Sequence, residues 1–183
     1  MSPTSVVGKR MESLVRDYMV DHIVTNKIFS DAQHGFVPGR YFMTQLLVVI
    51  ELWTEILDSD DPVDAIYCHF SEVFVTLSHQ ILLNKLKIYG RVGDTNYWIR
   101  VFLTGLTHLV LVNSSLSPWL EGLRSIPQGS VLEPILFILF IHDLHDMVRS
   151  TAHIFADNTK VYRTVQLQGD VTKSVKWSEK WQM

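Results

Sequence analysis

The sequence predicts an α+β fold, with helices packed on an antiparallel sheet. Apolar residues recur every three or four positions in several long segments, which indicates amphipathic helices. Segment 64–70 alternates two sets of side chains, and segments 152–156 and 159–165 have the pattern of strands joined by the two-residue turn Asp157-Asn158. This hairpin and a second strand pair interrupt a regular strand-helix-strand order, which disfavours a doubly wound parallel sheet.

Length and composition place the chain among globular proteins. Its 183 residues correspond to roughly one domain at about 150 residues per domain. An apolar fraction of 47% excludes a disordered tail as the main content, and the lone Cys68 excludes an internal disulfide framework. A net charge of -3 gives no global basic field, so any nucleic-acid site must be local. Without a secretion signal or an apolar run of membrane-spanning length, we expect an intracellular protein with no membrane anchor.

The N-terminal part is predicted to form two helices and a strand. The first helix begins at Ser5 and stops near Asn26. A loop rich in glycine and proline follows at 30–40, and a second helix covers 41–57. The apolar residues that make the first helix amphipathic are Val6, Val7, Met11, Leu14, Val15, Met19 and Ile23. In the strand at 64–70 the two alternating sets are Ile66, Cys68 and Phe70 on one face and Ala65, Tyr67 and His69 on the other.

Helical patterns return at 78–89 and again from Asp94, a residue suited to an N-cap. Gly90 separates these two helices. Segments 108–113 and 118–123 are predicted to be paired strands.

A further helix is predicted over 130–148. Its first four residues, from Ser130 to Glu133, spell a capping box, and Pro134 is tolerated because it lies in the first turn. After the hairpin, the remainder of the chain is polar and helical in pattern.

Four motifs follow one another along the chain: HGFVPGR (34–40), IYCHFSEVF (66–74), SIPQGSVLEPILF (125–137) and FADNTKVY (155–162). Together they resemble the ordered motifs of reverse transcriptases, in the variety found in non-LTR, LINE-type retroelements. The resemblance implies partial fingers and connecting helices at 1–62 and a polymerase palm at 63–183, with upstream fingers, thumb and any endonuclease domain outside this chain. It also implies an RNA template and a DNA primer as the family's partners.

Three aspartates in that family hold two Mg2+ ions, one at a strand end and two adjacent at a hairpin tip. Several anionic oxygens are needed because phosphoryl transfer brings two divalent ions close together. Carried over by motif, these positions are His69, Asp157 and Asn158. Only Asp157 keeps its charge, so we expect a degenerate metal site that binds no Mg2+ and supports no catalysis. From the residues alone, the structural interpretation is favoured: Asp-Asn is a good turn sequence, and His69 is compatible with capping or packing.

The resemblance places the nucleotide site at Phe74, Gln128, Gly129 and Arg40. Phe74 matches the aromatic residue that packs against the sugar, and the loop containing Gln128 and Gly129 matches the one beside the incoming nucleotide. Without the resemblance, an aromatic residue beside a strand is more often core, and a Pro-Gln-Gly loop is more often only a turn.

Several positions depart from the family's pattern. Val37 stands where a basic residue is usual, Glu72 replaces a lysine, Val75 replaces an aspartate, and Glu133 puts a carboxylate at a helix N-terminus. The changes at Val37, Glu72 and Glu133 weaken the attraction for phosphate. We therefore expect weak, salt-dependent binding of nucleic acid.

Two other groups are less informative. His142 and His145 have an i, i+3 spacing compatible with a metal, but no further Cys or His completes a set, so a solvated helix face is expected. Ser130 lacks the surroundings of a nucleophile and is expected to be an N-cap.

The sequence thus favours a reverse-transcriptase-derived palm without polymerase activity. The alternative is a noncatalytic module that keeps the palm fold and binds nucleic acid or protein. A third possibility is that no folded product is made. Self-association through exposed palm surface is expected if packing partners lie outside the chain.

Overall fold

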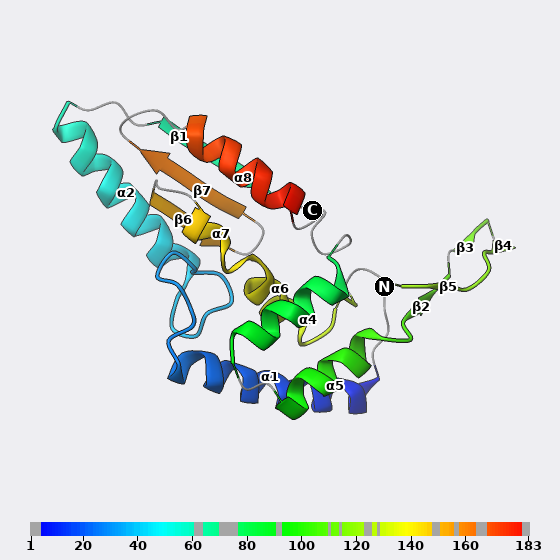
Figure 1. The fold of residues 1–183 in the computed structure, drawn as a ribbon. Helices are drawn as coiled ribbons and strands as arrows, with labels where there is room; N and C mark the ends of the chain where they lie inside the picture. Colours follow the sequence, from blue (N-terminus) through cyan, green and yellow to red (C-terminus); the bar gives the residue numbers. More distant parts are fainter. Residues whose placement is uncertain are drawn as a thin grey trace.

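The computed structural model describes residues 5–60, 64–69, 77–90, 93–109, 111–113, 115–122, 126–127, 129–147, 151–155, 158–163 and 168–180. A three-stranded antiparallel sheet lies toward one end of the molecule and a group of helices toward the other (Figure 1). This arrangement confirms the predicted α+β class. None of the helices in these ranges combines enough length with enough apolar character to span a bilayer.

The first two helices have nearly the predicted bounds. Helix α1 covers Val6–Thr25, and the Ser5 hydroxyl caps it by accepting a hydrogen bond from the Gly8 amide at 3.0 Å. Helix α2 covers Phe42–Asp58 and begins one residue later than expected.

The buried face of α1 differs from the one its apolar residues predict. Met19 and Ile23 are buried as expected, but the third buried residue is the acid Glu12. The apolar residues of the N-terminal part stay exposed, namely Val6, Val7, Met11 and Leu14. The prediction was wrong here because hydrogen bonds to a distant loop, described below, decide which side of the helix turns inward.

The sheet has the strand order β1-β7-β6, from Asp64–His69, Asn158–Arg163 and Thr151–Phe155. Ala65 pairs with Tyr162 and Tyr67 with Lys160, so these side chains share one face. Ile66 and Cys68 point to the opposite face, which confirms the predicted alternation within the described part of the strand. The connection between β6 and β7 differs from the prediction. Asn158 belongs to β7 and pairs with Phe155, so it is a strand residue rather than a turn residue.

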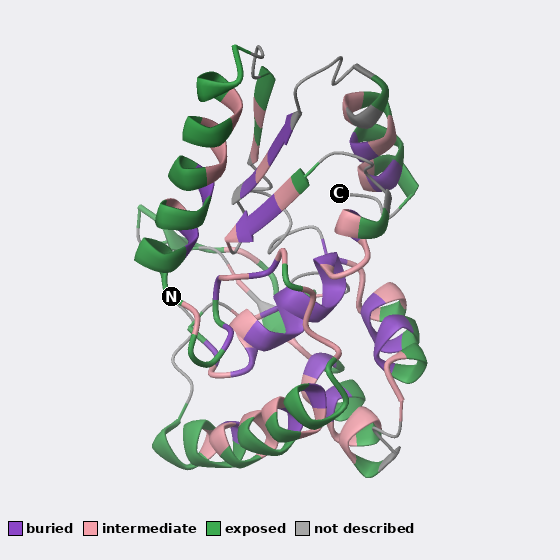
Figure 2. Ribbon diagram, turned by 90° about the vertical axis from the view of Figure 1, so that its left-hand side faces the viewer, coloured by how far each residue is buried: buried purple, intermediate pink, exposed green. Residues whose placement is uncertain are grey.

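Two helices flank the sheet. Trp53 of α2 meets Tyr162 edge to face with ring centres 5.9 Å apart, and Phe42 meets Phe155 in the same way at 5.4 Å. Helix α8, Gln168–Lys180, lies on the other side of the sheet, as Figure 2 shows.

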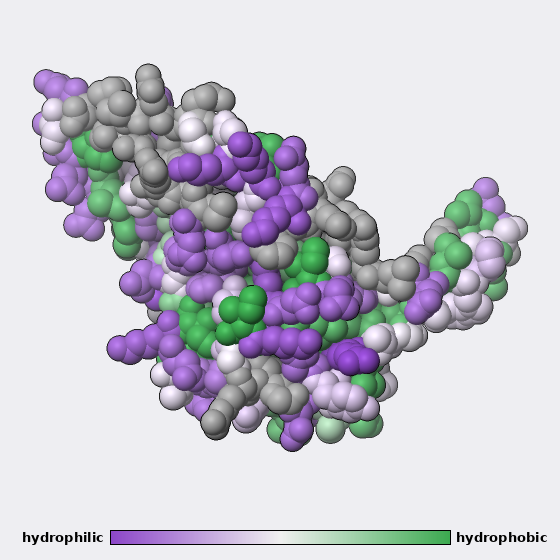
Figure 3. Space-filling view, viewed as in Figure 1, coloured by the Kyte–Doolittle hydropathy of each residue, from purple (hydrophilic) through white to green (hydrophobic). Residues whose placement is uncertain are grey.

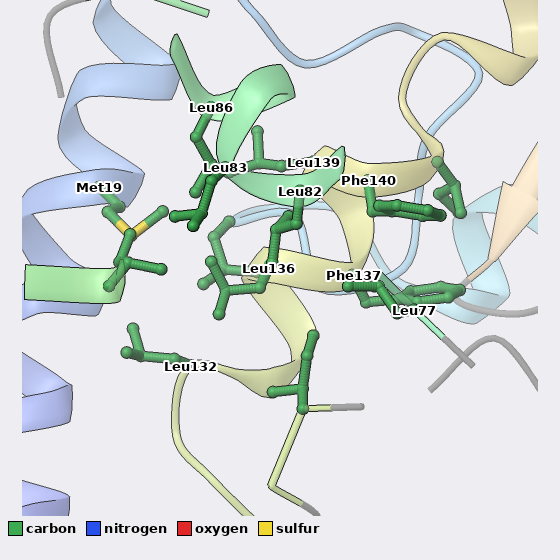
Figure 4. Close-up of a cluster of buried hydrophobic side chains, with 14 of the residues drawn as sticks. Met19, Leu77, Leu82, Leu83, Leu86, Leu132, Leu136, Phe137, Leu139 and Phe140 are labelled. Atoms are coloured by element: carbon green, nitrogen blue, oxygen red, sulfur yellow. The ribbon is translucent and has the colours of Figure 1, made fainter. Parts of the chain in front are cut away.

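The core is built around α6, Glu133–Ile141, in which every residue from Ile135 to Ile141 is buried. Helix α4 (His79–Ile88) packs against α6, and α5 (Gly93–Leu103) packs against α4. Figure 4 shows the leucines of α4 against Leu136, Leu139 and Phe140. The bounds of α4 agree with the prediction, whereas Asp94 lies inside the first turn of α5 rather than at an N-cap position.

The helix predicted over 130–148 is shorter and divided. Leu132 occupies the N-cap of α6, the helix ends at Ile141, and α7 covers Leu144–Met147. Ser130 is therefore not the N-cap, and the predicted capping box is wrong. The Ser130 hydroxyl and the Glu133 carboxylate instead form hydrogen bonds that hold the preceding loop.

A narrow β arm projects from the helical end of the molecule (Figure 1). Thr107–His108 (β2) pairs with Leu120–Glu121 (β5), and Leu111–Val112 (β3) pairs with Ser115–Leu116 (β4). The predicted pairing of 108–113 with 118–123 is thus right at the base of the arm and wrong near its tip, where a tighter hairpin forms.

The loop at 30–40 lies along the edge of β6. The His34 amide donates to the Ile154 carbonyl at 2.8 Å, and the Ile154 amide donates to the Ala32 carbonyl at 2.8 Å. These bonds form a short parallel bridge between Gln33 and Ile154. The loop is thereby fixed to the sheet that carries the candidate site.

Candidate functional site

The ends of the three strands meet at one end of the sheet. His69, the last residue of β1, pairs with Asn158, the first residue of β7, and Asn158 also pairs with Phe155, the last residue of β6. Two of the three positions that resemble the family's aspartates are therefore neighbours across the sheet. Asp157 lies outside the described residues.

The donor groups at this end of the sheet differ from those of a magnesium site. Histidine offers an imidazole nitrogen and asparagine a neutral amide oxygen, whereas Mg2+ favours carboxylate and water oxygens. Within the described ranges, no cluster of three His, Cys, Asp or Glu residues has the geometry to hold a metal ion. Asp157 is the remaining carboxylate among the three positions.

The sheet face directed toward α2 continues from the strand ends as a layer of aromatic and basic groups. The Lys160 ammonium lies 5.7 Å from the centre of the Tyr67 ring, and His153 stacks on Tyr162 with ring centres 5.6 Å apart. Burial lowers the pKa of His153, and His34 and Lys160 lower it further. Burial also raises the pKa of Tyr162 to about 12, so both rings are neutral at pH 7.

Two carboxylates hold the loop that resembles the family's nucleotide loop. The Gly129 amide donates to Glu133 Oε2 at 2.8 Å, while the Ser130 hydroxyl and the Val131 amide donate to Glu12 Oε2 at 2.6 and 2.7 Å. Gly129 has φ of +81°, a left-handed conformation that suits glycine. Gln128 and Phe74 lie outside the described residues, so their predicted roles stay predictions.

Glu12 is the residue that sequence reasoning missed. It lies seven residues before Met19 and eleven before Ile23, so all three fall on one helical stripe. An acidic residue on the same helical stripe as two apolar residues is the sequence signal that could have predicted this buried polar contact.

Arg40 is occupied within its own loop. Its Nη1 donates to the carbonyls of Ser30 and Gln33 at 2.6 Å each, and its Nη2 contacts Asp31 Oδ1 at 2.9 Å. The predicted contact of Arg40 with a nucleotide stays a prediction. Val37, in the same loop, is buried and takes part in packing.

The two histidines at 142 and 145 lie on either side of the break between α6 and α7. Their ring centres are 5.3 Å apart, and burial lowers the pKa of His142. Both are half-buried rather than fully solvated: the His142 ring packs edge to face on Tyr89 at 5.3 Å, and His145 Nδ1 lies 2.6 Å from the His142 carbonyl oxygen. The expectation of a solvated helix face is therefore wrong.

An antiparallel sheet flanked by helices, with a strand end paired to a hairpin, is the architecture of a polymerase palm. The sequence matches the family described as "Reverse transcriptase (RNA-dependent DNA polymerase)" over residues 1–183. The chain therefore belongs to the reverse transcriptase family, which confirms the resemblance seen in its motifs.

Two relatives from Drosophila melanogaster are similar to this chain. One is the probable RNA-directed DNA polymerase from transposon X-element, 24% identical over 190 residues that cover 96% of this chain and 21% of the relative. The other is the probable RNA-directed DNA polymerase from transposon BS, 25% identical over 146 residues that cover 79% of this chain and 16% of the relative. The chain thus spans about a fifth of the length of these curated relatives.

Proposed function

We propose that this chain is a catalytically inactive palm, with part of the fingers, of a reverse transcriptase from a non-LTR, LINE-type retroelement. The observation that carries the proposal is the pairing of His69 with Asn158. In this pairing the strand end meets the hairpin, as the family's metal site requires, but the two residues carry an imidazole and an amide instead of two carboxylates.

The electrostatic deficit at this position is large. At an effective dielectric constant of 20, one carboxylate beside a divalent ion supplies on the order of 10 kcal/mol of gross attraction before desolvation. The loss of two carboxylates removes most of the attraction for a pair of Mg2+ ions. The residues present therefore do not fit the family's metal ions.

Binding of an RNA template and a DNA primer is expected to be weak. Glu12 and Glu133 place two carboxylates at the loop that follows Pro127, and Arg40 is bonded to its own loop. The overall charge of -3 adds no attraction for phosphates. A submicromolar dissociation constant at physiological salt would contradict this part of the proposal.

Primer extension combined with thermal unfolding tests the proposal. The unaltered chain is expected to add no nucleotide with Mg2+ or Mn2+, and its Tm is expected not to change with either ion. The double variant His69→Asp with Asn158→Asp should gain a Mg2+-dependent rise in Tm but little turnover, because the contacts to the triphosphate are still missing.

A matched control adds Asp157→Asn to that double variant. It should lose the Mg2+-dependent rise in Tm, since the charge of the three-residue set falls again. Measurable extension by the unaltered chain would overturn the inactive assignment. Robust extension by the double variant would show that only the metal ligands had been lost.

The second candidate is a noncatalytic binding module. Support comes from the buried run from Ile135 to Ile141 in α6 and from the regular sheet, which form a packed scaffold independent of a metal site. Apolar side chains are exposed along both N-terminal helices, which favours protein over nucleic acid as the partner.

A further inference from the structure

Four polar side chains without hydrogen-bond partners in the described part of the chain lie where α2 meets the sheet. The unpartnered atoms are both amide atoms of Gln45, Trp53 Nε1, His153 Nδ1 and the Tyr162 hydroxyl. Gln45 is 1% exposed, Tyr162 2% and His153 7%. Buried polar groups in folded proteins are almost always bonded to protein or to ordered water, because an unpaired group loses its bonds with bulk water. Their concentration in one interface indicates a bound species that supplies these bonds.

The side of α2 that carries Gln45 is the side that contacts the sheet. Phe42, Gln45, Val49 and Trp53 are spaced by three, four and four residues, so they share one face of the helix. The ring contacts of Phe42 and Trp53 with the sheet lie at the two ends of this face. Figure 2 shows the buried and half-buried parts of α2 turned toward the strands. The Gln45 amide is therefore enclosed between the helix and the sheet.

The outer side of α2 is apolar instead. Met43, Leu47 and Ile50 are each 50–61% exposed, and Figure 3 shows apolar patches along the position of α2. The helix thus keeps an amide inside while apolar side chains face solvent. Burial of that amide is tolerated only if its donor and its acceptor are both hydrogen-bonded.

Two aromatic contacts fix the direction of α2 on the sheet. Phe42 contacts Phe155, the last residue of β6. Trp53 contacts Tyr162, which pairs with Thr151, the first residue of β6. Helix α2 therefore runs antiparallel to β6.

This alignment brings Gln45 and His153 to the same level of the interface. Gln45 lies three residues after Phe42, or about 4.5 Å along the helix. His153 lies two residues before Phe155, or about 7 Å along the strand in the same direction. Since the two phenylalanine rings are in contact, Gln45 and His153 form one pair of facing polar groups.

The second pair is Trp53 with Tyr162, whose rings meet edge to face with centres 5.9 Å apart. Val49 lies between Gln45 and Trp53 on the same helix face and is 2% exposed. An apolar side chain therefore separates the two pairs along the helix. Each pair needs hydrogen-bond partners of its own.

The unpartnered atoms determine which species fits between them. The Gln45 amide both donates and accepts, the Trp53 indole only donates, and the Tyr162 hydroxyl does both. His153 Nδ1 accepts when the ring proton is on Nε2. A metal cation would leave the donors unpaired, and an anion would leave the acceptors unpaired. Burial lowers the pKa of His153 and raises the pKa of Tyr162 to about 12, so the interface is lined by neutral groups. Water, which is neutral and both donates and accepts, fits all of them.

We propose that ordered water molecules are part of the interface between α2 and the sheet, one bridging Gln45 to His153 and another bridging Trp53 to Tyr162. The bridged atoms are buried, so these molecules are enclosed by protein and belong to the folded structure. The proposal holds for an active or an inactive palm, because it depends on neither a metal ion nor nucleic acid.

A high-resolution crystal structure of the 183-residue chain tests the proposal directly. We expect a water peak about 2.7–3.2 Å from both Gln45 and His153 Nδ1, and another at the same range from Trp53 Nε1 and the Tyr162 hydroxyl. Direct hydrogen bonds of these side chains with each other or with other protein groups would overturn the proposal. A gap without density, or an ion in place of water, would also overturn it.

A double-mutant cycle tests the bridge in solution. Gln45→Met and His153→Phe each remove the polar group and keep a side chain of similar size. In denaturant unfolding, the double variant should differ by about threefold or more in its unfolding equilibrium constant from the product of the two single effects, because one water links the two positions. Independent effects would contradict the bridge.

Gln45→Met combined with Thr159→Val is the matched control. The Thr159 hydroxyl is also buried without a hydrogen-bond partner among the described residues, but Thr159 points to the opposite face of the sheet from its neighbour Lys160. These two effects should multiply to within about twofold. Coupling as strong as that between positions 45 and 153 would show that the cycle reports general loosening of the sheet, and the bridge would be rejected.

Discussion

Glu12 and Ser130 are 118 positions apart in the sequence, yet the serine hydroxyl donates a 2.6 Å hydrogen bond to the glutamate carboxylate. The Val131 amide donates to the same oxygen, and Glu12 is only 2% exposed. Helix α1 is thus fastened by polar contacts to the segment that leads into the central helix α6.

Replacing Glu12 should destabilise the protein. Glu12→Ala leaves the buried Ser130 hydroxyl and the partly buried Val131 amide without an acceptor, so we expect a loss of about 2–3 kcal/mol. Glu12→Gln keeps one acceptor oxygen and should cost about 1 kcal/mol. Denaturant unfolding measures both, with Asp17→Ala on the exposed face of α1 as a control that should stay within about 0.5 kcal/mol. Equal effects of Glu12→Ala and Asp17→Ala would show that the buried bonds contribute little.

Two glycine substitutions should have opposite effects. Gly129 has φ of +81° and open space around the position of an added Cβ, so Gly129→Ala should cost about 1 kcal/mol through backbone strain alone. Gly169 lies in helix α8, also with open space, so Gly169→Ala should stabilise by about 0.5 kcal/mol. Shifts of Tm in the same direction for the two variants would contradict this.

A buried lysine connects α4 to the end of α6. Lys85 Nζ contacts Asp143 at 2.6 Å and donates to the Phe140 carbonyl, and the Trp177 indole donates to the same carboxylate at 3.0 Å. Burial lowers the pKa of Lys85 to about 8, although Asp143 opposes this shift. Asp143→Ala should therefore cost about 3 kcal/mol, because it removes the carboxylate that offsets burial of the ammonium.

Lys85→Met is the matched comparison. The Asp143 side chain is 33% exposed and keeps its bond to Trp177, so this change should cost only about 1 kcal/mol. A larger loss for Lys85→Met than for Asp143→Ala would mean that the lysine contributes mainly through packing.

Stability should fall in mild acid because of His153. Burial lowers its pKa below the ordinary histidine value of 6.5, so below that pH the unfolded chain takes up a proton before the folded chain does. Stability is then complete above about pH 6.5 and decreases as pH falls toward the folded-state pKa. His153→Phe keeps a ring against Tyr162 and should reduce the slope of unfolding free energy with pH by up to about 1.4 kcal/mol per unit.

Unfolding curves between neutral pH and pH 5 measure this slope. His34 and His142, whose pKa values burial also lowers, should account for part of the slope that persists in the variant. Parallel curves for the unaltered chain and His153→Phe would contradict a role for His153.

Local patterns made much of the fold predictable. The bounds of α1 and α2 and the alternation along β1 follow from periodicity and end signals, which act within a few residues. The motifs imply one site position at a strand end and two at a hairpin, and the pairing of His69 with Asn158 is consistent with this arrangement. The start of α6 and the inward turn of Glu12 were missed, because both depend on hydrogen bonds between segments far apart in the sequence. The use of Arg40 within its own loop was missed because a motif identifies a position, not the partners that compete for its side chain.

The bridge between Gln33 and Ile154 also limits how the sheet grows. Strands at a sheet edge recruit strands of other chains when their amide and carbonyl groups are free. The loop occupies both groups of Ile154 on the outer side of β6, and Arg40 keeps that loop in place. Within the described sheet, the outer side of β1 is left as the edge open to a new strand. Strand addition is therefore hindered at Ile154 on the β6 side, and β1 is the more open edge of the described sheet.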